Sequence, residues 1–188
     1  MPRQAMKGLV FAELADFIEQ RFGSLAGVPA PGMFNARAGY DHEELIRIVA
    51  TASAATGVAA PELLRTFGVH LFGRFAALYP VFFFEADSAL GFLGGIDTYI
   101  HGEVQKLYPG AEFPSFECRT QAAGELEMLY RSSRPLADLA EGLILGCVAH
   151  FGETIDVVRE DLPGAPGTAA RFTLTARVAA DALAAEET

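Results

Sequence analysis

The spacing of apolar residues changes once along this chain, near residue 110, and that change limits the folds open to it. Before this point apolar side chains recur at helical spacing; after it, alternating runs surround one helical run at 135–151. A period of two indicates strands and a period near 3.6 indicates helices. We therefore predict an α+β fold, with a helical N-terminal half packed on a C-terminal half that has a four-stranded antiparallel sheet and a helix. The expected strands are residues 113–119, 125–131, 154–159 and 171–178.

Glycine, proline and capping residues divide the helical half into four expected helices. Gly23 ends the first, because glycine readily adopts the backbone conformation found just after many helices. Asp41 is placed to cap the second, with Glu44 three residues later as in a capping box. Pro61 fits the first turn of the third helix, and Pro80 ends it. The expected helices are residues 6–22, 41–56, 61–78 and 88–107.

The chain is acidic and rich in apolar side chains. Of its 188 residues 51% are apolar, 15 are Phe, and the formal net charge is −10. Such a surface repels nucleic acid and anionic lipid, so we expect neither nucleic acid nor a membrane as a partner. No run of about 18 uncharged apolar residues is present, and residues 1–7 lack a signal-peptide core. We expect a cytoplasmic protein. Cys118 and Cys147 are too few for a disulfide framework or a zinc site.

Three hydrogen-bond donors recur at alternate positions near the end of one expected strand. If the segment is extended, Tyr130, Ser132 and Arg134 project from one face, because alternate strand residues share a side. A planar guanidinium holds a carboxylate bidentately while hydroxyl groups fill its other lone pairs. The row therefore suits a carboxylate-bearing ligand. A strand end with a solvated arginine explains the same spacing, and the residues alone leave both interpretations open.

His101 is the histidine with the most informative surroundings. Val104 and Tyr108 follow it at helical spacing, so the imidazole lies on the shoulder of an apolar stripe. A half-buried imidazole needs a partner for each ring nitrogen, and one partner can be a metal. A hydrogen-bonded histidine at the edge of a core has the same pattern. Catalytic motifs are missing: the sequence has no nucleophile elbow, no paired zinc histidines and no phosphate-binding glycine loop. We expect a protein that is not an enzyme.

Several separated segments resemble the heme nitric oxide/oxygen-binding (H-NOX) domain, the bacterial relative of the heme domain of soluble guanylate cyclase. Met6-Lys7-Gly8 resembles the start of the domain, and the segment 100–110 is similar to the helix that carries the proximal histidine. The row at 130–134 matches the Tyr-x-Ser-x-Arg signature. Segments 142–146 and 150–153 continue the similarity, which spans roughly residues 6–178 in the family's order.

This resemblance implies a role for each of the residues singled out above. His101 would be the axial ligand of the iron of heme b, which would lie between the two halves. Tyr130, Ser132 and Arg134 would bind the heme propionates, and Pro114 would press on the porphyrin and bend it. A single neutral imidazole leaves the sixth position of the iron free for a diatomic gas.

The resemblance also implies the side chains that surround the bound gas. In oxygen-binding members a tyrosine at the position of Leu139 donates a hydrogen bond to bound oxygen, and leucine has no donor. Bound oxygen carries negative charge and depends on such a donor in a dry pocket, whereas nitric oxide (NO) binds ferrous iron strongly without one. We therefore expect a sensor that binds NO and carbon monoxide and excludes oxygen. The expected distal pocket consists of Val10, Leu14, Leu71, Phe75, Leu139 and Leu143.

The expected organisation is one heme-binding domain over residues 6–180, with a distal helical part at 6–85 and a proximal part at 86–180. Residues 1–5 would be an N-terminal extension, and residues 181–188 a flexible acidic tail. The segment 24–39 is rich in Gly and Pro and is expected to be a loop, where many members of the family have a second helix. Solvent access to the distal pocket is therefore expected to differ in this chain.

Signalling is expected in trans, because the chain has no effector domain of its own. NO binding would weaken the bond between the iron and His101, and the two halves would rotate relative to each other. A histidine kinase or a cyclic-di-GMP enzyme is the usual partner in the family. The alternative is a small-molecule or tetrapyrrole-binding module of the 4-vinyl reductase type, which resembles the C-terminal unit. His101 would then be a core residue.

Overall fold

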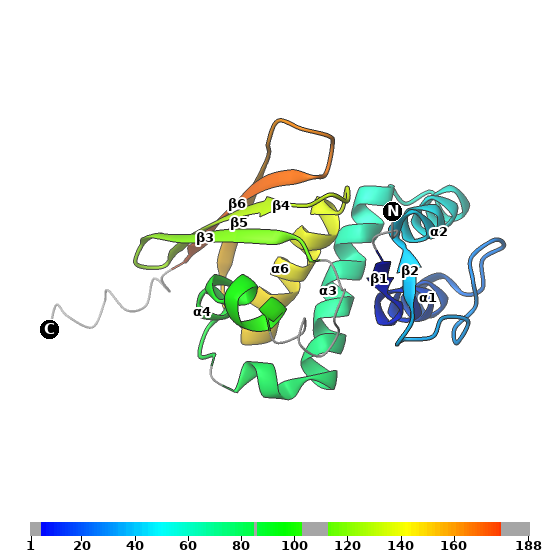
Figure 1. Ribbon diagram of the computed structural model, residues 1–188, viewed down its shortest axis with the longest axis horizontal. Helices are drawn as coiled ribbons and strands as arrows, with labels where there is room; N and C mark the ends of the chain where they lie inside the picture. The colour runs from blue at the N-terminus through cyan, green and yellow to red at the C-terminus, as the bar shows by residue number, and fades with distance from the viewer. Residues whose placement is uncertain (1–4, 85, 103–112, 178–188) are drawn as a thin grey trace, which may run out of the picture.

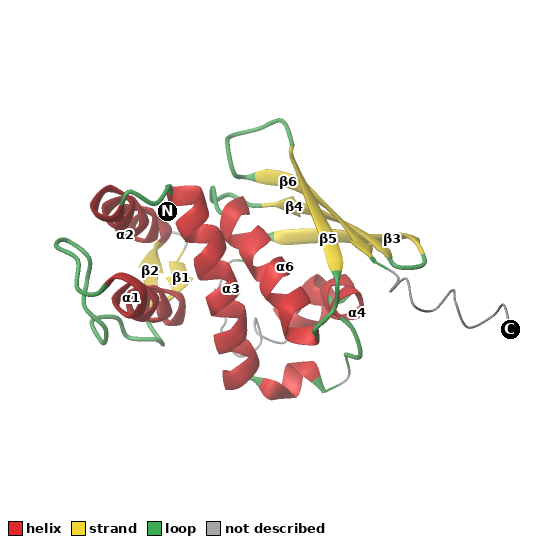
Figure 2. Ribbon diagram, turned by 180° about the vertical axis from the view of Figure 1, so that it is seen from behind, coloured by secondary structure: helices red, strands yellow, loops and turns green. Residues whose placement is uncertain are grey.

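The computed structural model describes residues 5–84, 86–102 and 113–177, and it has the α+β fold expected from the sequence. In Figures 1 and 2 helices α1 to α3 occupy one side, and the sheet with α6 and α4 occupies the other. The N-terminal half comprises β1 (Ala5–Lys7), α1 (Gly8–Phe22), β2 (Gly39–Asp41), α2 (His42–Thr56), α3 (Ala60–Leu78) and the 3-10 helix η1 (Pro80–Phe83). The C-terminal half comprises α4 (Ala89–Gly94), the π-helix η2 (Ile96–His101), β3 (Ser115–Ala122), β4 (Glu125–Arg131), α6 (Ala137–Phe151), β5 (Ile155–Asp161) and β6 (Ala169–Ala176).

The predicted sheet is confirmed. Its four strands are antiparallel and lie in the order β3-β4-β6-β5. Along β4 and β6 alternate side chains are buried, and Met128, Phe172 and Leu174 are completely enclosed. This buried face packs against α6 and α4, as Figure 2 shows. The alternation read from the sequence therefore corresponds to one face covered by helices.

The first helix begins two residues later than predicted. Met6 and Lys7 belong to β1, where they pair with Tyr40 and Gly39 of β2 in a two-stranded sheet. The helix starts at Gly8, where an added Cβ atom would collide with the carbonyl oxygen of Asn35. The apolar periodicity of residues 6–22 cannot show this pairing, because the partner strand lies more than thirty residues further along the chain.

The second helix has the predicted N-cap but not the predicted capping box. The Asp41 side chain accepts a hydrogen bond from the backbone N–H of Glu43 at 3.1 Å. Glu44 instead forms an ion pair with Arg47, one turn further along the helix, at 2.6 Å. The helix ends at Gly57, whose φ of 75° is the left-handed conformation that glycine adopts without strain.

The continuous helix predicted for residues 88–107 is wrong in its central part. Helix α4 starts after Ser88, whose hydroxyl accepts a hydrogen bond from Gly91 N–H, and it ends at Gly94. Gly95 separates it from η2, a π-helix that ends at His101. Consecutive glycines lower helix stability by about 1 kcal/mol each relative to alanine. Residues 103–107 lie outside the described part of the chain.

Helices α3 and α6 cross in direct backbone contact and join the two halves. An added Cβ at Gly68 would lie 2.6 Å from the carbonyl oxygen of Leu139, and one at Gly146 would lie 2.7 Å from Cβ of Phe72. An added Cβ at Gly142 would collide with the carbonyl oxygen of Arg65. Only glycine permits this approach, because any side chain would separate the two helices. The relative position of the halves therefore depends on this crossing.

An ion-pair network reinforces the same junction. Arg159 of β5 is bound to Asp138 of α6 at 2.7 Å and to Glu141 of α6 at 3.1 Å. Arg65 of α3 approaches Glu141 from the other side, at 3.0 Å. Arg159 is only 15% exposed and these carboxylates hold its pKa above the usual value, although burial alone would lower it. The network links α3, α6 and the sheet.

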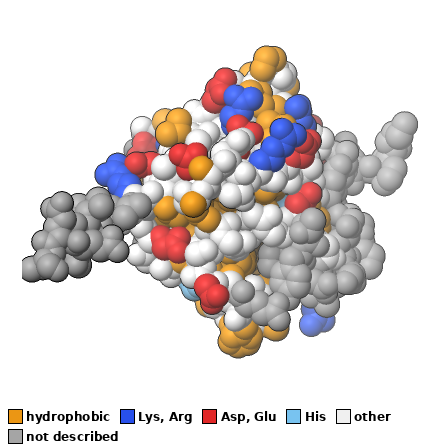
Figure 3. Space-filling view, turned by 90° about the vertical axis from the view of Figure 1, so that its left-hand side faces the viewer, with side chains coloured by type: hydrophobic (Ala, Val, Ile, Leu, Met, Phe, Trp, Pro, Cys, Tyr) orange, Lys and Arg blue, Asp and Glu red, His pale blue; other side chains and the backbone are white. Residues whose placement is uncertain are grey.

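The surface carries mixed charges. On the face shown in Figure 3, basic and acidic side chains lie among one another. Ion pairs that join β5 to β6, or to the residue that follows β6, include Arg171 with Glu160 at 2.7 Å and Arg177 with Asp156 at 2.6 Å. Among the described helices, none combines the length and apolar character needed to cross a membrane.

Candidate functional site

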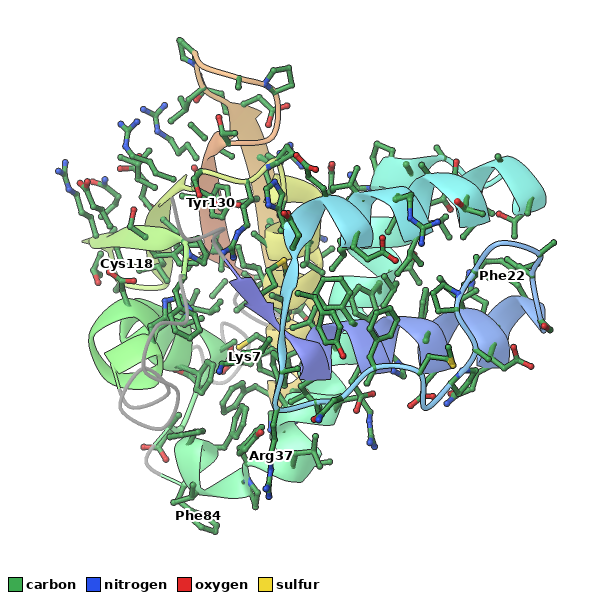
Figure 4. The ribbon with its side chains drawn as sticks, turned by 45° about the vertical axis from the view of Figure 1, so that its right-hand side comes forward. Lys7, Phe22, Arg37, Phe84, Cys118 and Tyr130 are labelled. Atoms are coloured by element: carbon green, nitrogen blue, oxygen red, sulfur yellow. The ribbon has the colours of Figure 1, made fainter. Side chains whose placement is uncertain are left out.

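A cavity of about 280 Å³ lies where the two halves meet. Its walls come from β1, the first turn of α1, α3 and η1 on one side, and from α4, η2, β3, β4 and α6 on the other. The walls are mostly aromatic and aliphatic, as in sites for small organic ligands. Lys7 and Tyr130, labelled in Figure 4, extend from β1 and β4 at this junction. In the described parts of the chain, the polar side chains at the wall are Lys7, Tyr79, His101, Tyr130, Ser132 and Arg134.

The structure places Tyr130, Ser132 and Arg134 on the same cavity wall, but not as an extended row. Strand β4 ends at Arg131, so only Tyr130 is a strand residue. Ser132 N–H donates to the carbonyl oxygen of Thr168 at 2.8 Å, and the Ser132 hydroxyl accepts from Arg134 N–H at 3.0 Å. This local hydrogen bond bends the chain before Pro135. The three side chains converge through a turn rather than through strand alternation.

Two of these three side chains are deeply buried. Tyr130 is 1% exposed and Arg134 is 5% exposed. Burial raises the pKa of the Tyr130 phenol, although its hydrogen bond to Ser132 acts in the opposite direction. The phenol is therefore protonated at neutral pH and serves as a donor. A buried guanidinium beside a phenol and a hydroxyl is a set of donors that suits an anionic group with several acceptor oxygens.

His101 lies at the end of η2, with its ring against the sheet half. Its imidazole stacks on Phe113, with ring centroids 4.8 Å apart, and lies 6.0 Å from the ring of Phe116. Its Nδ1 atom is 3.1 Å from a carboxylate oxygen of Asp97. Burial lowers the pKa of His101, while Asp97 acts in the opposite direction. The ring is therefore neutral at neutral pH.

The contact with Asp97 selects one tautomer of the neutral ring. When Nδ1 donates its proton to the carboxylate, the lone pair remains on Nε2. Histidines that bind metals commonly donate their other ring N–H to a carboxylate in this way. Asp97 was not predicted from the sequence. Its spacing of four residues from His101 places the two side chains on one helical face and is the signal that identifies such pairs.

Most of the residues expected to surround the gas line the cavity. These are Val10 of α1, Leu71 and Phe75 of α3, and Leu139 and Leu143 of α6. Pro114, expected to press on the porphyrin, also lies on the wall.

Leu14 is the exception among the expected distal residues. It is 2% exposed and belongs to the N-terminal core with Phe11 and Phe17, and it is not among the side chains that line the cavity. Although it shares a helix face with Val10, it lies one turn further into the helical half.

Several wall residues have no periodic signal in the sequence. Ala36 lies in the loop between α1 and β2, Tyr79 follows the last residue of α3, and Phe82 and Phe83 belong to η1. Lys7 lies on the wall from β1. Loops and single turns have no repeating apolar face, so periodicity could not place these residues.

Comparison with known families and structures gives consistent results. A family model described as haem-NO-binding matches residues 7–159. The structure is similar to that of the unliganded Fe(II) H-NOX protein of K. algicida, with a TM-score of 0.84 and 28% identity over 93% of this chain and 98% of that one. Similarity extends to the H-NOX of Shewanella woodyi in the Fe(II)CO state, with 33% identity, a TM-score of 0.76, and coverage of 92% and 95%.

A more distant structure shows the same fold. The H-NOX protein of S. oneidensis in the Fe(II)NO state has 24% identity and a TM-score of 0.83, with coverage of 92% of this chain and 100% of that chain. No curated protein sequence matches this chain.

Proposed function

This chain belongs to the haem-NO-binding family, and from that membership we propose that it binds heme b and senses NO. Members of the family are heme-based gas sensors rather than enzymes. The proposal adds which residues of this chain bind the heme, which gases it selects and how it signals. The observation that carries it is a single apolar cavity lined by His101 together with Tyr130, Ser132 and Arg134.

The residues of the cavity fit a tetrapyrrole. A porphyrin is flat and apolar and carries two carboxylates, and the cavity pairs aromatic and aliphatic walls with a buried arginine. The neutral ring of His101 offers Nε2, the nitrogen that remains available when Asp97 accepts from Nδ1. A metal ligand must be deprotonated, so the lowered pKa of His101 favours coordination. Heme iron, when bound, supplies the position at which a diatomic gas coordinates.

Asp97 acts in this proposal as a positioning residue for His101. Its carboxylate fixes the orientation of the imidazole, and Phe113 restricts the ring from one face. A hydrogen bond to the far nitrogen increases the basicity of the ligating nitrogen. The strength of the bond between iron and His101 would therefore depend on a side chain of the same π-helix.

Gas selection is assigned to the apolar part of the wall. Leu71, Phe75, Leu139 and Leu143 offer no hydrogen-bond donor, and bound oxygen requires one. Tyr79 is the phenol on the α3 side of the cavity, two helical turns beyond Leu71 and thus about 12 Å further along the axis. We assign selectivity for NO and carbon monoxide over oxygen to Leu139.

Signalling in trans is proposed to follow movement between the two halves. The axial residue belongs to the C-terminal half, whereas Val10, Leu71 and Phe75 belong to the helical half. A change at His101 would alter how the halves pack across the glycine contacts of α3 and α6. The partner proposed is a histidine kinase or a cyclic-di-GMP enzyme. The cytoplasmic location and the division of residues 6–180 at residue 85 stay predictions.

Absorption spectra of the purified ferrous protein, recorded first without oxygen and then in air, test this function. We expect a Soret band in the range of about 400–430 nm, shifts on addition of NO and of carbon monoxide, and no stable oxygen complex in air. A stable oxygen complex would contradict the selectivity but not heme binding. In that case Tyr79→Phe shows whether Tyr79 is the donor. A colourless protein that gains no Soret band when heme is added would refute the proposal and favour a non-sensor tetrapyrrole or small-molecule module.

A further inference from the structure

Within the described part of the chain, one exposed residue lines the cavity, and it lies in the loop that joins α1 to β2. Among the described residues that line it, Ala36 is exposed, whereas the others are buried or half-buried. Its neighbours on the wall are Leu9 and Val10, in the first turn of α1. The exposed surface at Ala36 therefore adjoins the part of the cavity wall that the first turn of α1 supplies.

The segment Asn35 to Ala38, which we term the strap, is anchored by backbone atoms. Gly8 N–H donates to the carbonyl oxygen of Ala38 at 2.8 Å, and Leu9 N–H donates to that of Ala36 at 3.1 Å. These two donors at the start of α1 thereby gain partners without an acidic cap. Figure 4 shows the loop that carries Arg37 passing the start of this helix.

Side chains on either side of Ala36 hold the strap in place as well. Asn35 N–H donates to the Tyr40 hydroxyl at 2.9 Å, and the Asn35 side chain accepts from Arg37 N–H at 3.0 Å. Phe34 packs against Phe11 and Tyr40, with ring centroids 5.3 and 5.1 Å away. The side chain of Ala36 makes none of these contacts. Its size can therefore change while the anchors of the strap stay in place.

We propose that the strap forms the rim of a route by which small uncharged gases reach the cavity, and that the side chain at position 36 sets the rate of access. The proposal rests on the proposed gas-binding function. A methyl group leaves the opening free, whereas a larger apolar side chain would occupy it. Position 36 would control how fast a gas arrives, and Leu139 would control which gas stays bound.

Flash photolysis of the carbon monoxide complex of the heme-loaded protein tests the proposal. In Ala36→Phe the bimolecular rebinding rate should fall about tenfold, within the range over which association rates vary among variants of one site. The fraction that rebinds before escape should rise. Ala36→Gly should rebind faster than the unmodified protein. Ala30→Phe is the matched control, because Ala30 is exposed in the same loop but does not line the cavity.

The outcomes separate the access route from the function itself. If the unmodified protein forms no carbon monoxide complex, both the function and the route are refuted. If the complex forms and Ala36→Phe and Ala36→Gly rebind at the unmodified rate, only the route is refuted. Equal slowing in Ala30→Phe also refutes it, because bulk anywhere in the loop would then suffice.

A second measurement does not depend on the rebinding chemistry. In crystals of the heme-loaded protein under xenon pressure, we expect a xenon atom beside Ala36 in the unmodified protein and none there in Ala36→Phe. Xenon elsewhere on the wall of the unmodified protein, and none beside Ala36, would contradict the proposal.

Discussion

The two walls of the cavity differ in chemistry, and each depends on a different kind of interaction. The wall with His101, Tyr130 and Arg134 carries polar groups that are oriented by specific hydrogen bonds, as Asp97 orients His101. The apolar wall, with Leu71 of α3 and Leu139 of α6, is positioned by the packing of these two helices against each other. The polar wall is therefore suited to retaining a ligand, and the apolar wall to selecting what binds beside it.

Loss of the axial residue should have the largest effect on the polar wall. His101→Gly removes the proposed iron ligand, so the ferrous protein should lose the spectrum of a histidine-bound heme. Added imidazole should restore that spectrum, because it can occupy the space that the side chain leaves. Absorption spectra with and without imidazole provide the measurement, and His42→Gln at the start of α2 is the control. An unchanged Soret band in His101→Gly would show that another residue is the ligand.

Removal of the buried guanidinium should weaken heme retention without changing gas selection. Hydrogen bonds to charged groups contribute about 1.5–3 kcal/mol, so Arg134→Ala should release heme about 10–100-fold faster. Transfer of heme to an excess of apomyoglobin measures this rate. Arg131→Ala is the matched control, since Arg131 is exposed at the end of β4 and does not line the cavity. Equal heme loss in the two variants would show that Arg134 has no special role.

A side chain at the crossing of α3 and α6 should disturb the apolar wall. Gly142→Ala introduces a methyl group that collides with the carbonyl oxygen of Arg65, and overpacking of this kind costs about 1–3 kcal/mol. Denaturant unfolding measures the loss. Gly73→Ala on α3 is the control: an added Cβ there meets no atom within 4 Å, so stability should rise by up to about 1 kcal/mol through helix propensity. Equal stability in the two variants would mean that the helices separate at no cost.

A donor on the apolar wall should change gas selection by a smaller free energy. Leu139→Tyr offers a phenol to bound oxygen, and a typical hydrogen bond contributes about 0.5–1.5 kcal/mol. Oxygen affinity should rise by up to about tenfold, measured by titration of the ferrous protein with oxygen. Leu139→Phe has a similar ring without the hydroxyl and should show no gain. If both variants respond equally, pocket size rather than hydrogen bonding determines selection.

The helices and strands of this protein could be predicted where apolar residues recur regularly on one face, and less well elsewhere. Helices α2, α3 and α6 and the strands of the sheet follow from apolar periodicity and from residues such as Asp41 and Gly57. Neither the break at Gly94 and Gly95 nor the π-helix that follows was predicted. A helix with an altered hydrogen-bond pattern retains nearly the same spacing of apolar residues, so periodicity does not reveal it.

The candidate site could likewise be predicted from the sequence only in part. His101, Tyr130, Ser132 and Arg134 were found from residue type, spacing and family resemblance, and the structure brings all four to one cavity. The last three were expected to share one face if the segment is extended. That condition is not met, because β4 ends at Arg131 and a hydrogen bond between Ser132 and Arg134 bends the chain after it. The predicted residues therefore line one cavity, although a turn and not a strand brings the last three of them there.

The sequence by itself determined the α+β fold and the family, and it singled out the residues proposed to bind a carboxylate and a metal, because these depend on local periodicity and chemical type. The tertiary structure alone decided that Asp97 contacts His101, that Leu14 lies in the core and that Ala36 borders the cavity. It also decided that α3 and α6 meet backbone to backbone at Gly142. The contacts at Gly142 and Ala36 join segments that are distant in the sequence, so no short sequence window contains both partners. The contact of Asp97 with His101 is local, but it depends on the backbone geometry of the π-helix.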